Sequence, residues 1–148
     1  MAEKKLHVYV SYEPDDQVYA DRLNEWSHTN GDAAAYNRRV ELDVAAPEAE
    51  ATKDELRRQI AAADLVVCVI SQGTGRSAWV EWELNEAKNA PGSKGLIGIK
   101  LFEQARTPPA MVDCGAIFVP FRRTSVERAV EWAMKERQTR GDFTLLDE

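Results

Sequence analysis

The stretch Leu65-Val-Val-Cys-Val-Ile70 runs into Ser71-Gln-Gly-Thr-Gly-Arg-Ser77 and then into Ala78-Trp-Val-Glu-Trp-Glu-Leu84. Its first part is an apolar run without polar alternation, which is typical of a central parallel strand buried on both faces. Its middle part contains the glycines and serines of a loop, and its last part has apolar residues at helical spacing. This order of strand, loop and helix predicts one βα unit of an α/β domain.

Further short apolar runs precede and follow this unit, with helical patterns between them. The expected strands are Leu6–Val10, Val40–Val44, Leu65–Ile70, Leu96–Leu101 and Ala116–Pro120. Strands alternating with helices at this spacing predict a flavodoxin-like, three-layer α/β fold. We expect a five-stranded, mostly parallel sheet in the order 2-1-3-4-5, with helices on both faces.

Helix starts are predicted from side chains that can cap the first turn. The first expected helix is capped by Asp15 or Asp16 and has Val18, Tyr19, Leu23 and Trp26 on one face. The second is Asp54–Ala63, which begins after a capping box of Thr52 and Glu55. The third is Ala78–Asn89, capped by Ser77, and the last runs from Ser125 through Met134 to near Gly141.

Length and composition exclude several classes of protein. The 148 residues are one domain's length, so we expect a single domain over 1–148, with 1–5 and 141–148 as frayed or docking tails. The net charge of −6 gives no basic footprint for nucleic acid. No apolar run reaches the roughly 18 residues of a membrane span, and the N-terminus has no signal-peptide pattern. Two cysteines without metal spacing predict no metal site, and a cytoplasmic location with reduced thiols.

The expected sheet order predicts where a ligand binds. Ligands of such sheets bind outside the carboxyl ends of the strands, where the strand order reverses. These ends are Ser11-Tyr12 and Ser71-Gln-Gly73. Glu83 and Trp79 are i, i+4 neighbours on the flank of the helix that follows, so Glu83 is a carboxylate placed to be partly buried and still reach the cleft. The alternative stays open that Glu83 only complements the helix N-terminus or pairs with an arginine.

Trp82 lies roughly opposite the core-facing side of the same helix, about 200° from Val80 on a helical wheel. An outward tryptophan is either covered by a neighbouring segment or part of a contact surface with another subunit. Trp82 is therefore a candidate assembly surface.

Four segments together resemble Toll/interleukin receptor (TIR) domains. They are Val8-Tyr-Val-Ser-Tyr-Glu-Pro-Asp-Asp16, Asp64-Leu-Val-Val-Cys-Val-Ile-Ser71, Ser77-Ala-Trp-Val-Glu-Trp-Glu-Leu-Asn-Glu-Ala87 and Lys94-Gly-Leu-Ile-Gly-Ile-Lys-Leu101. The third carries a W-x-x-x-E-[IL] pattern. The chain is most similar to the TIR-like proteins of bacterial Thoeris anti-phage systems, and the similarity extends from Leu6 to Leu101.

This resemblance implies a function. Catalytic TIR domains hydrolyse or cyclise NAD+, and their catalytic glutamate falls on Glu83. The first-strand loop beside the nicotinamide-ribose pocket falls on Tyr9, Ser11 and Tyr12, and the loop that gates the site begins at Asp43. Together with Ser71 at its strand end and Trp79 as a stacking ring, these residues are the expected substrate site.

The expected protein is then an NAD+ nucleosidase or cyclase that releases nicotinamide and makes an ADP-ribose-derived signal in anti-phage immunity. NAD+ is its substrate and no cofactor is expected. The expected partners are other copies of the TIR-type surface and a downstream effector reached through the diffusible product. Two alternatives stay open: a catalytically silent adaptor that works by self-assembly, and an enzyme like the nucleoside deoxyribosyltransferases, which also uses a glutamate at a glycosidic carbon.

Overall fold

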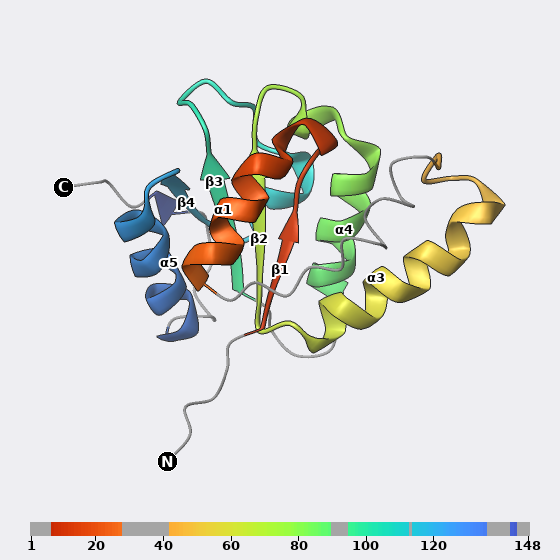
Figure 1. Ribbon diagram of the computed structural model, residues 1–148, viewed down its shortest axis with the longest axis horizontal. Helices are drawn as coiled ribbons and strands as arrows, with labels where there is room; N and C mark the ends of the chain where they lie inside the picture. Colours follow the sequence, from red (N-terminus) through yellow and green to blue (C-terminus); the bar gives the residue numbers. More distant parts are fainter. Residues whose placement is uncertain (1–6, 28–41, 90–94, 113, 136–142, 145–148) are drawn as a thin grey trace, which may run out of the picture.

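The computed structural model describes residues 7–27, 42–89, 95–112, 114–135 and 143–144 (Figure 1). Within these residues one parallel sheet has the strand order β1-β2-β3-β4-β5. The strands are β1 (Val8–Ser11), β2 (Leu65–Ile70), β3 (Gly95–Lys100), β4 (Ile117–Pro120) and β5 (Phe143–Thr144). The position of β2 inside the sheet, between β1 and β3, agrees with its side chains, all six of which are buried.

Four of the expected strands are present as β1 to β4, and they are neighbours in the expected order. The expected strand Val40–Val44 is wrong over residues 42–44, which form no strand, and 40–41 lie outside the described residues. The reason is local: the Asp43 carboxylate accepts the N–H of Ala45 at 2.9 Å, and the Asp43 carbonyl accepts the N–H of Ala46. A side chain that bonds the backbone two residues on favours a turn over an extended strand.

Helices cover both faces of the sheet (Figure 1). Alternate residues of β2 point to opposite faces, as strand geometry requires. Leu65, Val67 and Val69 pack in one core with α1 (Gln17–Ser27) and α5 (Arg123–Lys135). Val66, Cys68 and Ile70 pack in a second core with α3 (Glu50–Ala62) and α4 (Ala78–Asn89). The described elements therefore form three layers.

The helix α4 follows the predicted pattern. Val80, Leu84 and Ala87 are buried against the sheet, as their spacing predicts. The Ser77 hydroxyl accepts the Val80 N–H at 3.1 Å, so the predicted N-cap is confirmed. Glu83 is buried on the same helix beside Leu84. The packing of α4 against the sheet thus fixes the position of Glu83 relative to the strands.

Three helix predictions are wrong in detail. On α1 Leu23 is buried as predicted, but Val18 is 63% exposed and Tyr19 is exposed, while Ala20 is buried. The side chain of Trp26 lies outside the described residues. The helix α3 begins at Glu50 rather than Asp54, because the 3-10 turn η2 (Pro47–Ala49) leads directly into it and Thr52 is buried inside the helix. The helix α5 begins at Arg123, and Ser125 is buried within its first turn. The expected end of that helix near Gly141 lies outside the described residues.

Phe143 and Thr144 extend the sheet at its edge. They lie in the C-terminal stretch expected to fray or dock, and they pair in parallel with Ile117 and Phe118 of β4. Two residues have no periodicity that a sequence pattern can detect, so no strand was expected there. Among the described residues, no helix combines the length and apolar character needed to cross a membrane.

Candidate functional site

A buried carboxylate joins α4 to the first strand. Tyr9 and Ser11 alternate along β1, so their side chains emerge on the same face of the sheet. The Tyr9 hydroxyl donates to one oxygen of Glu83 at 2.7 Å, and the Ser11 hydroxyl donates to the other at 2.5 Å. Glu83 is 1% exposed, and Tyr9 and Ser11 are also buried. We call these three residues the carboxylate cluster.

Burying the Glu83 carboxylate in this cluster costs free energy of folding. A buried carboxylate destabilises the folded state unless hydrogen bonds compensate for its lost hydration. Here the two hydroxyls occupy both oxygens from one side and hold the carboxylate in one orientation. A carboxylate fixed in this way can stabilise positive charge that develops near it, because it needs little reorganisation.

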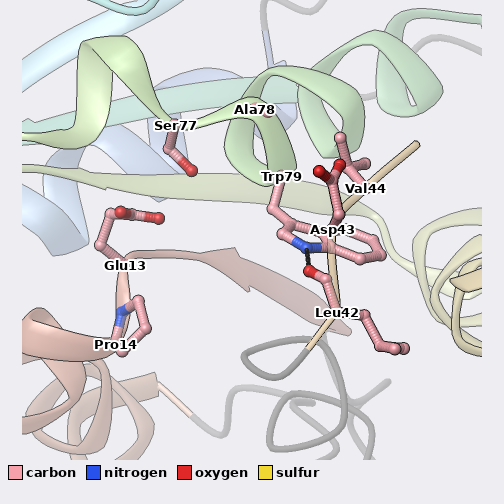
Figure 2. Close-up of a pocket in the computed structure, with 8 residues that line it drawn as sticks. All are labelled: Glu13, Pro14, Leu42, Asp43, Val44, Ser77, Ala78 and Trp79. Atoms are coloured by element: carbon pink, nitrogen blue, oxygen red, sulfur yellow. Dashed lines mark hydrogen bonds between the residues drawn. The ribbon is translucent and has the colours of Figure 1, made fainter. Parts of the chain in front are cut away.

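A pocket of ≈ 370 Å³ opens beside the same two elements (Figure 2). Its lining comes from the segment after β1, the turn before α3 and the first residues of α4: Glu13, Pro14, Leu42, Asp43, Val44, Ser77, Ala78 and Trp79. Since β1 ends at Ser11 and α4 begins at Ala78, the pocket lies at the carboxyl end of β1 and the N-terminus of α4. This is the edge of the sheet where the sequence predicts a ligand.

Trp79 connects the walls of this pocket. Its indole N–H donates to the Leu42 carbonyl at 2.9 Å, which Figure 2 marks as a dashed line. Its ring also meets the Trp82 ring edge-on, with 5.9 Å between centroids. The ring is therefore held at the pocket wall by a hydrogen bond on one side and by aromatic packing on the other.

The charge of the pocket is negative. Of the eight described residues that line it, Glu13 and Asp43 carry carboxylates and none carries a cationic side chain. An acidic pocket with an aromatic wall suits a positively charged planar ring. Within the described ranges, no group of three or more His, Cys, Asp or Glu side chains is arranged to hold a metal ion.

Glu83 itself does not line this pocket. Trp79 lies one helical turn before Glu83 on α4, and Glu13 lies two residues after Ser11, so the pocket and the carboxylate cluster share two elements. In this form of the protein the carboxylate is covered, and a ligand seated in the pocket reaches it only after a local shift of the intervening side chains.

The structure thus brings together some of the predicted site residues and separates others. Tyr9 and Ser11 meet Glu83, while Asp43 and Trp79 line the adjacent pocket. Tyr12 packs against the core on the opposite face of the sheet, together with Phe121. The different direction follows from the pleat, because Tyr12 is one residue beyond Ser11.

Ser71 and Trp82 contact other parts of the protein. The Ser71 hydroxyl donates to Asp16 at 2.6 Å. Trp82 is half-buried between α4 and α3, with the Lys53 ammonium 5.7 Å and the Arg57 guanidinium 5.3 Å from its ring centroid. Its use as an assembly surface stays a prediction, and in this structure α3 covers part of the ring.

Several pocket residues were not predicted from the sequence. Glu13, Pro14, Leu42, Val44, Ser77 and Ala78 line the pocket, and Asp16 and Thr74 form a polar cluster behind it. The available signal was the run Glu13-Pro-Asp-Asp16 directly after β1, because an acidic turn at a strand's carboxyl end borders the expected ligand site.

Residues 9–106 match the family model described as Thoeris protein ThsB, TIR-like domain. The match spans more than half of the chain and includes β1 from Tyr9 onward, α4 and β3, hence every residue of the carboxylate cluster. No curated protein matches the chain significantly.

Proposed function

The chain belongs to the TIR-like domain family of Thoeris ThsB, a family of a bacterial defence system, and on that premise we propose that it cleaves the nicotinamide–ribose bond of NAD+. The observation that carries the proposal is the carboxylate cluster: Glu83 is held by Tyr9 and Ser11 beside a pocket walled by Trp79. Glu83 is proposed as the catalytic residue, and Asp43 and Trp79 as residues that contact the substrate.

The proposed reaction suits a site with one central carboxylate. When the bond between ribose C1′ and the pyridinium nitrogen breaks, its electron pair goes to the nitrogen and neutralises the ring. The leaving group is then neutral nicotinamide, so no general acid is required, unlike in ordinary glycoside hydrolysis. The ribose develops oxocarbenium character, and the Glu83 carboxylate is proposed to stabilise that positive charge.

The fate of the ribose depends on which nucleophile reaches C1′. Attack by water gives ADP-ribose and a proton. Attack by a nitrogen of the substrate's own adenine gives a cyclic ADP-ribose and a proton. Glu83 is 1% exposed, so water is scarce at the carboxylate, and a cyclic product is our first choice. Such a product would act as a diffusible signal for a separate effector.

The charge of the pocket supports the nicotinamide end of NAD+ as its occupant. Glu13 and Asp43 attract the cationic ring, and Trp79 offers a surface on which the ring can stack. The diphosphate of NAD+ would instead lie outside the two carboxylates.

The direct test is incubation of the purified protein with NAD+, at low and high protein concentration, followed by chromatography and mass measurement of the products. We expect nicotinamide release, together with a product whose mass is one water lower than that of ADP-ribose. A product with the mass of ADP-ribose itself would show that the protein hydrolyses NAD+ and does not cyclise it. Cleavage of deoxynucleosides with NAD+ left intact would indicate the transferase alternative instead.

Trp79 gives a second, more local prediction. Trp79→Ala removes the stacking surface and is expected to raise KM for NAD+ about fivefold, because a stacked ring contributes on the order of 1 kcal/mol beyond its buried area. Trp79→Phe keeps a ring but loses the hydrogen bond to Leu42, so its KM is expected to lie between that of the wild type and that of Trp79→Ala. Steady-state kinetics measure this. The control is Trp132→Ala on α5, whose ring is partly exposed away from the pocket. Equal KM values for Trp79→Ala and the control would remove Trp79 from the substrate site.

A catalytically silent adaptor is the second candidate, and one observation favours it. Glu83 is 1% exposed and fully engaged by two hydroxyls, as a purely structural carboxylate would be. An adaptor would release no nicotinamide at any concentration and would lose its self-association on Trp82→Ala. Light scattering of the wild-type protein and this variant measures that loss.

A further inference from the structure

A second buried carboxylate lies behind the pocket and takes no part in the proposed chemistry. Asp16, the last residue of the 3-10 turn η1 (Pro14–Asp16), is 5% exposed. In the part of the chain that the structure describes, its side chain accepts one hydrogen bond, from the Ser71 hydroxyl at 2.6 Å. Asp16 and Ser71 are 55 residues apart in sequence, and the bond joins the segment after β1 to the loop after β2.

Ser71 passes this connection on to a third residue. Its backbone N–H donates to the Thr74 hydroxyl oxygen at 2.8 Å, and the two hydroxyl oxygens are 3.1 Å apart. The Thr74 hydroxyl in turn donates to the Val69 carbonyl at 3.2 Å. Thr74 is buried and begins the 3-10 turn η3 (Thr74–Arg76). We call Asp16, Ser71 and Thr74 the loop tie.

The loop tie connects the two segments that form opposite parts of the pocket. The turn η1 carries Pro14 and follows Glu13, whereas η3 leads directly into Ser77, Ala78 and Trp79 (Figure 2). A shift of either turn changes the separation of Glu13 from Trp79. A misplacement of about 1 Å in a binding group is enough to weaken binding or turnover.

Its burial indicates that the loop tie is more than incidental. A carboxylate that is taken out of water and given one side-chain hydrogen bond lowers stability relative to an apolar residue. A carboxylate on the surface of a loop stays hydrated and does not carry this cost. We therefore expect that the hydrogen bond of Asp16, by holding the two turns together, compensates for the desolvation of its carboxylate.

From these contacts we infer that Asp16 is a positioning residue, which sets the width of the pocket by holding η1 to η3 through Ser71. Ser71, predicted from the sequence as a substrate contact, acts in this assignment through its bond to Asp16. The inference rests on the proposed function for its kinetic readout, but the geometry of the loops can be measured without any substrate.

The experiment compares Asp16→Ala, Asp16→Asn and Ser71→Ala with Asp15→Asn, an exposed neighbour in the same turn. The asparagine carbonyl oxygen can still accept the Ser71 hydroxyl, so Asp16→Asn should keep the wild-type KM for NAD+. Asp16→Ala and Ser71→Ala break the bond and should raise KM on the order of tenfold with kcat nearly unchanged. Amide hydrogen exchange at Arg76 and Ser77, whose N–H groups bond to the carbonyls of Gly73 and Thr74, should accelerate in the same two variants, with or without NAD+.

The outcomes separate this inference from the proposed function. An unchanged KM and unchanged exchange in Asp16→Ala would overturn the loop tie, as would Asp16→Asn behaving like Asp16→Ala. Absence of nicotinamide release from the wild-type protein would overturn the proposed function alone, and hydrogen exchange would then decide the loop tie. If Asp16→Ala does not fold, the comparison of Ser71→Ala with Asp16→Asn carries the test.

Discussion

Replacing Glu83 by glutamine is expected to slow NAD+ cleavage severely while the protein stays folded. Glutamine has nearly the same shape, and its amide can still pair with the Tyr9 and Ser11 hydroxyls. It lacks the negative charge that would stabilise the oxocarbenium-like ribose, so kcat should fall by about 10²–10³-fold. Nicotinamide release at saturating NAD+ measures the loss, and circular dichroism checks the fold.

The matched control for this change is Glu86→Gln. Glu86 lies on the same helix, and its carboxylate is partly exposed and pairs with Arg57 at 3.3 Å. Both variants replace a glutamate by glutamine. Losing the ion pair between Glu86 and Arg57 should change the stability little, because surface ion pairs of this kind contribute little to it. Glu86→Gln should therefore cleave NAD+ like the wild type. Equal rates of NAD+ cleavage for both variants would show that the charge of Glu83 has no catalytic role.

Leu84→Ala is expected to cause the largest loss of stability among the changes considered. Leu84 is fully buried in the core between α4 and the sheet. Removing such a side chain loses its transfer free energy and leaves a cavity, which together lower the free energy of unfolding by about 2–5 kcal/mol. Urea unfolding followed by circular dichroism measures the change as a lower midpoint at a similar slope.

Val18→Ala on α1 is the comparison for this prediction. Both changes shorten an aliphatic side chain on a helix, but Val18 is largely exposed. Its substitution should change the free energy of unfolding by less than about 0.5 kcal/mol. If Leu84→Ala were no more destabilising than Val18→Ala, α4 would not be docked as described, and the placement of Glu83 would lose its support.

The parts of the fold that local patterns encode could be predicted. The unbroken apolar run Leu65–Ile70 specifies a central strand, and the spacing of Val80, Leu84 and Ala87 specifies the buried side of α4. The expected strand at 40–44 failed over its described residues, because the Asp43 side chain forms a turn that competes with extended backbone. For α1 the predicted face is right at Leu23 but wrong at Val18 and Tyr19, which are exposed while Ala20 is buried.

The candidate site was predictable only in part. Alternation along β1 places Tyr9 and Ser11 on one face, but their pairing with Glu83 joins residues more than 70 positions apart. Family resemblance, rather than periodicity, brought these residues together before the structure was known. The pocket residues Leu42 and Ser77 come from loops whose positions depend on tertiary contacts, which sequence patterns describe least well.

The central claim is that Glu83 acts on the scissile bond of NAD+ that is bound in the pocket beside β1. A crystal structure of the Glu83→Gln protein with NAD+ bound tests it most directly. The account predicts the nicotinamide ring against Trp79, near Glu13 and Asp43, with the ribose C1′ next to the side chain at position 83. NAD+ bound elsewhere on the protein, with the carboxylate cluster still closed, would contradict it.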